Sequence, residues 1–108
     1  MEDSSNLALV ISTVELEADA QRLANELVAQ SLAACVQIDG PIQSVYRWNG
    51  QVEHASEFRL MIKTTLAVWP NLKERLRKMH PYDEPEIIML PIAGASEGYQ
   101  AWVIDQTS

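Results

Sequence analysis

Two long strand-like segments meet at the dipeptide Asn49-Gly50, and this hairpin limits the possible folds more than any other feature of the chain. Asn-Gly between alternating apolar residues is the strongest short-range signal for a two-residue type I′ turn. The returning arm, residues 51–65, would extend roughly 50 Å at about 3.3 Å per residue. A compact chain of this length is only about 35 Å across. The hairpin is therefore expected to overhang its own domain or to bend at bulges.

Aromatic side chains gather near the tip of this hairpin. Tyr46 and Trp48 are two residues apart, so both fall on one face of the strand. An overhanging strand of this kind exposes an unpaired edge and an apolar patch unless another chain covers them. We therefore predict an obligate oligomer, with Tyr46, Trp48 and the C-terminal Trp102 at the interface between copies.

Two segments have the pattern of amphipathic helices. Apolar residues recur at helical spacing over residues 15–30, and Ser12 with Glu15 predicts a capping box at the start of this helix. A second helix is expected to follow a cap at Thr65 and to end before Pro81, because proline cannot continue a helix.

The other strands are shorter. Residues 6–13 alternate as a first strand, and residues 33–38 begin a second strand that resumes at 42–48. Pro41 interrupts it, which predicts a bulge or an edge position. Residues 33–38 and 87–92 carry little polarity, so both are expected to be central strands.

The resulting order, β-α-β-β-α-β with a short closing helix or strand around Trp102, predicts an α+β fold. Two helices should cover one face of a four-stranded antiparallel sheet, which is the ferredoxin-like sandwich. At 108 residues the whole chain, 1–108, is expected to form a single domain.

Composition narrows the classes of partner. The chain has 15 acidic and 8 basic side chains and a net charge of -7, which disfavours nucleic acid and anionic membranes and suits cations. Residues 1–6 lack the features of a signal peptide, and no apolar run approaches the ~20 residues of a membrane span. A single cysteine, Cys35, cannot form an intramolecular disulfide. A cytoplasmic location is the expectation.

Residues 80–86 concentrate the polar chemistry of the chain. His80 and Tyr82 are followed by three carboxylates, while Pro81 and Pro85 stiffen the link into the last strand. Imidazole with carboxylates suits zinc, copper or nickel. A histidine at a helix end also commonly bonds the backbone there, and the chain has no His-x-x-x-His or Cys-x-x-Cys pattern. Both roles of His80 stay open.

Two further residues have alternative roles. Cys35 lies in an apolar run, so it is an inert core thiol, a soft metal ligand, or a thiol that faces a cleft between subunits. Glu86 opens the last strand, where a buried carboxylate needs a cationic partner such as Lys63 or an arginine. The alternative is a cleft for an anion or a metal, lined by Glu86 with Lys63, His80 and Tyr82.

Six blocks in this order resemble the CutA1 divalent-cation tolerance proteins: LAACV at 32–36, SVYRW at 44–48 with Gly50 and Glu53, IKT at 62–64, HPYDEPEII at 80–88, LPI at 90–92, and Gly98-Tyr99 with Trp102. The resemblance implies a ferredoxin-like fold and a tightly packed homotrimer whose hairpins extend sheets across subunits. It also implies a link to copper and other divalent metals. The trimer is similar to that of the PII signalling proteins, which bind small effectors in clefts between subunits.

The resemblance turns the polar residues into a candidate site. The implied metal ligands for copper or zinc are His80, Glu86 and Cys35, with no organic cofactor. The chain departs from the family in having Asp83 where a glutamate is usual. It also has Ser12-Thr13 where some bacterial relatives carry a cysteine, which weakens a preference for copper.

The predicted function is a cytosolic, trimeric divalent-cation tolerance protein that binds copper or other divalent metals. The alternative is a PII-like sensor that binds a small anionic effector in intersubunit clefts lined by Lys63, Tyr82, Asp83 and Trp48. No glycine-rich phosphate loop supports a nucleotide. An enzyme is not predicted, because the sequence has no recognisable cofactor motif or activated nucleophile.

Overall fold

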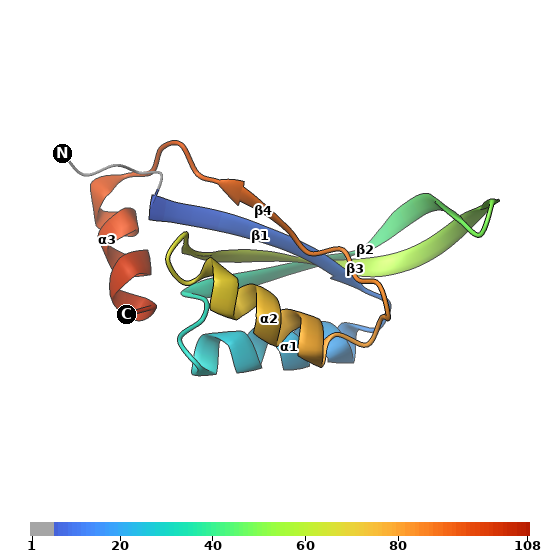
Figure 1. Ribbon diagram of the computed structural model, residues 1–108, viewed down its shortest axis with the longest axis horizontal. Helices are drawn as coiled ribbons and strands as arrows, with labels where there is room; N and C mark the ends of the chain where they lie inside the picture. The colour runs from blue at the N-terminus through green and yellow to red at the C-terminus, as the bar shows by residue number, and fades with distance from the viewer. Residues whose placement is uncertain (1–5) are drawn as a thin grey trace.

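The computed structural model describes residues 6–108 and contains four strands and three helices. In chain order these are β1 (Leu7–Val14), α1 (Glu17–Ala29), β2 (Cys35–Trp48), β3 (Gln51–Thr65), α2 (Trp69–Met79), β4 (Ile88–Pro91) and α3 (Glu97–Gln106) (Figure 1). The strands form one antiparallel sheet in the order β2-β3-β1-β4, so the predicted α+β ferredoxin-like fold is confirmed. Within the described residues, no helix is both long and apolar enough to cross a membrane.

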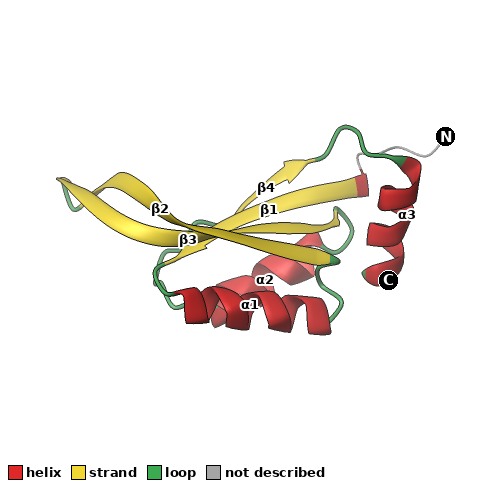
Figure 2. Cartoon of the chain, turned by 180° about the vertical axis from the view of Figure 1, so that it is seen from behind, coloured by secondary structure: helices red, strands yellow, loops and turns green. Residues whose placement is uncertain are grey.

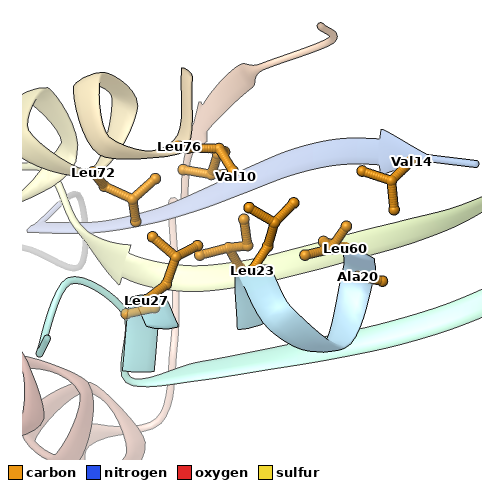
Figure 3. Close-up of a cluster of buried hydrophobic side chains, with 10 residues drawn as sticks. Val10, Val14, Ala20, Leu23, Leu27, Leu60, Leu72 and Leu76 are labelled. Atoms are coloured by element: carbon orange, nitrogen blue, oxygen red, sulfur yellow. The ribbon is translucent and has the colours of Figure 1, made fainter. Parts of the chain in front are cut away.

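The main core lies between the sheet and the helices α1 and α2, which cover the same face (Figure 2). Side chains alternate along a strand, so every second residue of β1 and β3 points toward these helices. The helices contribute the apolar positions that the helical spacing predicted. The fully buried cluster contains Val10, Val14, Leu60 and Ile62 from the sheet with Ala20, Leu23, Leu27, Leu72 and Leu76 from the helices (Figure 3).

The opposite face of the sheet, called the open face below, carries the alternate residues of the same strands. Leu9 and Ile11 of β1 are half-buried there. In register beside them, Leu90 and Ile88 of β4 are 44% and 47% exposed. At one end of the sheet α3 packs through Val103. The open face is thus apolar where β1 and β4 meet.

The β2–β3 hairpin extends well past the end of its neighbouring strand β1. β1 pairs with β3 only as far as the Val14–Phe58 pair, whereas β2 and β3 stay paired to their ends at residues 48 and 51. The turn has φ angles of 51° at Asn49 and 74° at Gly50, as a type I′ turn requires. The domain consequently measures 49 × 25 × 22 Å, and the hairpin projects beyond the helices (Figure 1). The predicted overhang is confirmed.

The pairing of β2 with β3 is irregular at one place, between Asp39 and Ile42. Gly40 has a φ of +149° there. The prediction that Pro41 marks a bulge or an edge is confirmed in both respects, because β2 is also an outer strand of the sheet.

Three predictions about elements were wrong. Residues 33–38 and 87–92 were expected to be central, but β2 and β4 are the two outer strands. In β4 the second apolar face, with Ile88 and Leu90, lies on the open face instead of under a second helix layer. The capping box is also absent: α1 begins at Glu17 after Leu16, and Ser12 lies inside β1. At the second helix, the predicted cap residue Thr65 does accept a backbone hydrogen bond, from the Val68 N–H at 3.2 Å, just before α2 begins.

Candidate functional site

His80 ends α2 and turns the chain toward the candidate site. Its N–H donates to the Leu76 carbonyl, and its extended backbone leads into Pro81. The side chain is only 8% exposed. Its Nε2 lies 3.0 Å from the Thr13 carbonyl oxygen and 3.1 Å from Ser12 Oγ, while the Tyr82 N–H donates to Nδ1 at 3.1 Å. The ring is therefore held on both sides.

These partners fix the tautomer of His80. A carbonyl oxygen only accepts, so Nε2 carries the proton that is donated to Thr13. Nδ1 must then be the unprotonated nitrogen, since it accepts from the Tyr82 N–H. The one ring lone pair that a metal could use is occupied within the protein. Through these bonds, His80 joins β1 to the loop of residues 81–86.

The surroundings of His80 favour this neutral ring. Burial lowers the pKa of His80, and this effect outweighs the hydrogen bond to Thr13 and the charge of Asp19, which raise it. Arg22 lowers the pKa further, while Glu57 raises it. The imidazole is therefore neutral at pH 7.

Tyr82 connects this ring to a carboxylate on β3. Its ring centroid lies 4.9 Å from that of His80, and its hydroxyl donates to Glu57 Oε2 at 2.8 Å. Burial raises the pKa of Tyr82, and the Glu57 carboxylate raises it further. The phenol thus remains a hydrogen-bond donor at any physiological pH. Glu57 itself is 8% exposed, beside the last residue pair of β1 and β3.

A cleft of about 1140 Å³ surrounds this pair, between the overhanging hairpin and the 81–86 loop, and is called the acidic cleft below. Of the described residues that line it, none is Lys or Arg, and the one basic group is His54. Such a lining attracts cations and repels anions. Its carboxylates belong to Glu15, Glu57, Asp83, Glu84 and Glu86, and its aromatic rings to Tyr46, Trp48 and Tyr82.

A smaller hollow of about 750 Å³ lies against α3, lined by Asn6, Glu97 and Gln100 among others. It contains none of the residues that the sequence proposed for a site. Four of the proposed site residues, Trp48, Tyr82, Asp83 and Glu86, line the acidic cleft instead.

The structure separates the residues that the sequence proposed as one site. Trp48, Tyr82, Asp83 and Glu86 line the acidic cleft, and His80 stands behind it. Cys35 does not join them. It pairs across the sheet with Lys63, six positions along β3 from Glu57, which is about 20 Å of strand. Within residues 6–108, no three His, Cys, Asp or Glu side chains are grouped closely enough to hold a metal ion.

Glu86 differs from its expected environment. It is exposed, and Lys63 donates to the Gln37 side chain rather than to Glu86. The positive side chain that Glu86 influences is Arg59, whose pKa is raised mainly by two hydrogen bonds to Asp39, at 2.8 and 3.3 Å, and slightly by Glu86. The carboxylate of Glu86 therefore remains accessible from the acidic cleft.

Glu57 and Glu15 were not predicted as site residues. Glu57 alternates with apolar neighbours on β3 and has the pattern of a solvent-facing strand residue. Its burial depends on the loop that folds over it, through Tyr82. No local signal marks such a contact, because it joins segments 25 residues apart.

The three residues predicted for an interface are accessible in the single copy. Trp48 is 54% exposed at the hairpin tip, Tyr46 lies beside it, and Trp102 stacks near Tyr99 on α3 with ring centroids 5.6 Å apart. Their role between copies stays a prediction.

Comparison with known proteins gives consistent matches over nearly the whole chain. A family model described as CutA1 divalent ion tolerance protein matches residues 8–106. The divalent-cation tolerance protein CutA of Thermus thermophilus is 43% identical over 99 residues, which cover 92% of this chain and 96% of that protein. The chloroplastic CutA protein of Arabidopsis thaliana is 42% identical over 99% of this chain and 60% of that longer protein. The solved structure of CutA from Synechococcus elongatus matches with a TM-score of 0.93 at 37% identity, covering 99% of this chain and 95% of that chain.

Proposed function

The chain belongs to the family of CutA1 divalent ion tolerance proteins, as its motifs predicted, and from this premise we propose that it is a cytosolic homotrimer that binds copper or other divalent metal ions. The observation that carries the proposal is the acidic cleft, whose five carboxylates face no lysine or arginine among the described lining residues. The family and its Thermus thermophilus member are named for tolerance of divalent cations and not for a catalysed reaction, and we propose a non-enzymatic role here as well.

The open face and the overhanging hairpin support the homotrimer. Ile88 and Leu90 leave apolar surface on the open face, and the hairpin tip adds Trp48. Residues 51–57 of β3 extend past β1, so this part of β3 pairs with β2 alone. Further copies of the same chain would cover the apolar surface and complete the sheet, as obligate homo-oligomers do.

The donor set supports a cation that binds between copies. One copy groups no three suitable ligands within residues 6–108, and His80 has committed its lone pair. We propose Glu57 and Glu86 as the principal donors, with a neighbouring copy supplying the rest, Cys35 being one candidate. Carboxylates alone would select weakly between metals, but affinity still rises to Cu²⁺ along the divalent series.

Calorimetry with copper and zinc salts tests the metal proposal. We expect Glu57→Gln and Glu86→Gln each to weaken Cu²⁺ binding about tenfold or more, because each removes one anionic donor from the cleft. Gln at position 57 still has an oxygen that can accept the Tyr82 hydrogen bond, so the loop is kept.

Glu74→Gln is the matched control. Glu74 lies on the exposed side of α2, bonded to Arg77, and should leave the affinity unchanged. Equal binding by the wild type and both cleft variants would exclude the acidic cleft as the site. Absence of any metal-dependent heat in the wild type would overturn metal binding itself.

The PII-like alternative meets an obstacle in this cleft. A small anionic effector would face carboxylates, and Lys63, its predicted contact, lies outside the cleft. Thermal unfolding with a panel of anionic metabolites in the presence of a chelator distinguishes the two functions. A metabolite that raises the melting temperature under these conditions would favour the sensor over the metal-binding protein.

A further inference from the structure

His80, Tyr82 and Glu57 form a continuous series of contacts from the end of α2 to the acidic cleft. The first contact joins the Tyr82 N–H to Nδ1 of His80, and the last joins the Tyr82 hydroxyl to Glu57. Both ends of Tyr82, its backbone and its phenol, are therefore anchored. The position of the Glu57 carboxylate depends on the position of this loop residue.

The imidazole provides two separate anchors. Through its Nε2 proton it is bonded to β1, at the Thr13 carbonyl and next to Ser12 Oγ. Through its Nδ1 lone pair it is bonded to the loop. Ser12 and His80 are both buried, so neither bond competes freely with water. The ring thus fixes the position of the 81–86 loop relative to β1.

We propose that His80 is the positioning residue of the acidic cleft: its Nδ1 lone pair holds the backbone of Tyr82, so that the Tyr82 phenol orients the Glu57 carboxylate for a cation. The effect of His80 on cation affinity rests on the proposed function. The placement of Tyr82 by His80 does not, and it is measured without any metal.

Two substitutions at position 80 separate the two anchors. The side-chain amide of Asn reaches the place of Nδ1 and can accept from the Tyr82 N–H, whereas that of Gln reaches the place of Nε2 and can donate to Thr13. Each variant keeps one hydrogen bond and loses the other, so a general loss of stability affects both. Only the proposed role predicts that they differ at the cleft.

The placement of Tyr82 is read from crystal structures of both metal-free variants. His80→Asn should retain the hydrogen bond between Tyr82 and Glu57, and His80→Gln should lose it. Retention in both variants, or loss in both, would overturn the positioning role. If the wild type binds no metal, the proposed function fails while this comparison still decides the inference.

Cu²⁺ calorimetry extends the test to affinity. His80→Asn should stay within about threefold of the wild type, while His80→Gln should weaken binding about tenfold, since the Glu57 carboxylate is no longer oriented. Tyr82→Phe keeps the backbone anchor and removes the hydroxyl, so it should weaken binding as much as His80→Gln does.

The double variant His80→Gln/Tyr82→Phe should show no additional loss of affinity, because both changes break one series of contacts. Additive losses, or full affinity in Tyr82→Phe, would overturn the proposal. Tyr82→Phe also keeps the proposal testable if either substitution at position 80 prevents folding.

Discussion

The Tyr82 hydroxyl and the Glu57 carboxylate meet at 2.8 Å, beside the last residue pair of β1 and β3. A hydrogen bond to a charged and largely buried acceptor contributes about 1.5–3 kcal/mol to stability. Together with the bond from the Tyr82 N–H to His80 Nδ1, this contact holds the 81–86 loop against the sheet.

Replacing Tyr82 with phenylalanine should therefore lower the free energy of unfolding by about 1.5–3 kcal/mol, because the Glu57 oxygen loses its donor while the apolar ring stays. Urea denaturation at a fixed protein concentration measures the change. Tyr99→Phe is the control, since Tyr99 contributes a ring contact with Trp102 on α3 and should change stability by less than about 0.5 kcal/mol. Equal effects of the two substitutions would contradict the assigned contact.

His80 should also make stability depend on pH. Burial lowers its pKa below the ordinary value of about 6.5, and the charge of Arg22 lowers it as well. The charges of Asp19 and Glu57 raise the pKa but do not offset the burial. The unfolded chain thus binds a proton at His80 more readily than the folded chain. Its contribution to stability is complete above about pH 6.5 and is lost as the pH falls through the folded pKa.

Urea denaturation at several pH values between about 7.5 and 5 checks this slope. His80→Asn should flatten it, because no group at position 80 then titrates. An unchanged slope in His80→Asn would show that another group is responsible.

Among the secondary-structure elements, β2 has one irregularity, a shift in its pairing with β3 between Asp39 and Ile42. It lies where the part of the hairpin beside β1 gives way to the overhanging part. A Cβ atom at Gly40 would lie 2.8 Å from Phe58 Cδ2 and 2.9 Å from the Glu57 carbonyl oxygen, at a φ of +149°. Gly40→Ala should therefore destabilise the protein by about 1–3 kcal/mol, through backbone strain and the close contact with β3.

Gly98→Ala is the matched control for this substitution. A Cβ atom at Gly98 meets nothing within 4 Å, and alanine favours a helix more than glycine does, so α3 should gain up to about 1 kcal/mol. Thermal unfolding of the two variants, side by side, checks both signs. Similar melting temperatures for Gly40→Ala and Gly98→Ala would contradict the strain at the irregularity.

The elements that local patterns define were predicted well. Asn49-Gly50 specified the turn, and the spacing of Leu23 and Leu27 specified the buried side of α1, because these signals depend only on nearby residues. The place of β4 in the sheet could not be predicted in this way. Its apolar residues alternate between the helix-covered core, where Met89 packs, and the open face, where Ile88 lies. The periodicity of apolar residues does not show whether an apolar strand face is covered by a helix of the same chain or is left exposed for contact with another chain.

The candidate site was only partly predictable for a similar reason. Tyr82, Asp83 and Glu86 are neighbours in sequence, and all three line the acidic cleft. The place of Glu57 depends on how β3 meets the loop. Cys35 was grouped with His80, but Cys35 pairs with Lys63 on β3, whereas His80 bonds to Thr13, whose partner on β3 is Arg59. Contacts of this kind follow from strand register, which the sequence does not state.

The open face and the overhanging hairpin together predict that several copies of the chain assemble. Analytical ultracentrifugation should show a particle of three chains at micromolar concentration. Ile88→Glu and Trp48→Glu should each shift it toward single chains, because each places a charge in the proposed apolar contact. Val28→Glu, at an exposed apolar residue on α1, is the control and should leave the trimer intact. A wild-type particle of one chain would overturn the assembly and the shared metal site together.

The overhang also bears on how sequences of this kind can change over time. Beyond Phe58 the hairpin has no β1 strand beside it, so its own domain places few demands on the side chains near its tip. If neighbouring copies receive it, selection on those side chains acts through another molecule. A tolerated substitution near Trp48 would then be compensated at positions that a single copy keeps far apart. Paired substitutions that look unrelated within one chain would, in that case, record the geometry of the assembly.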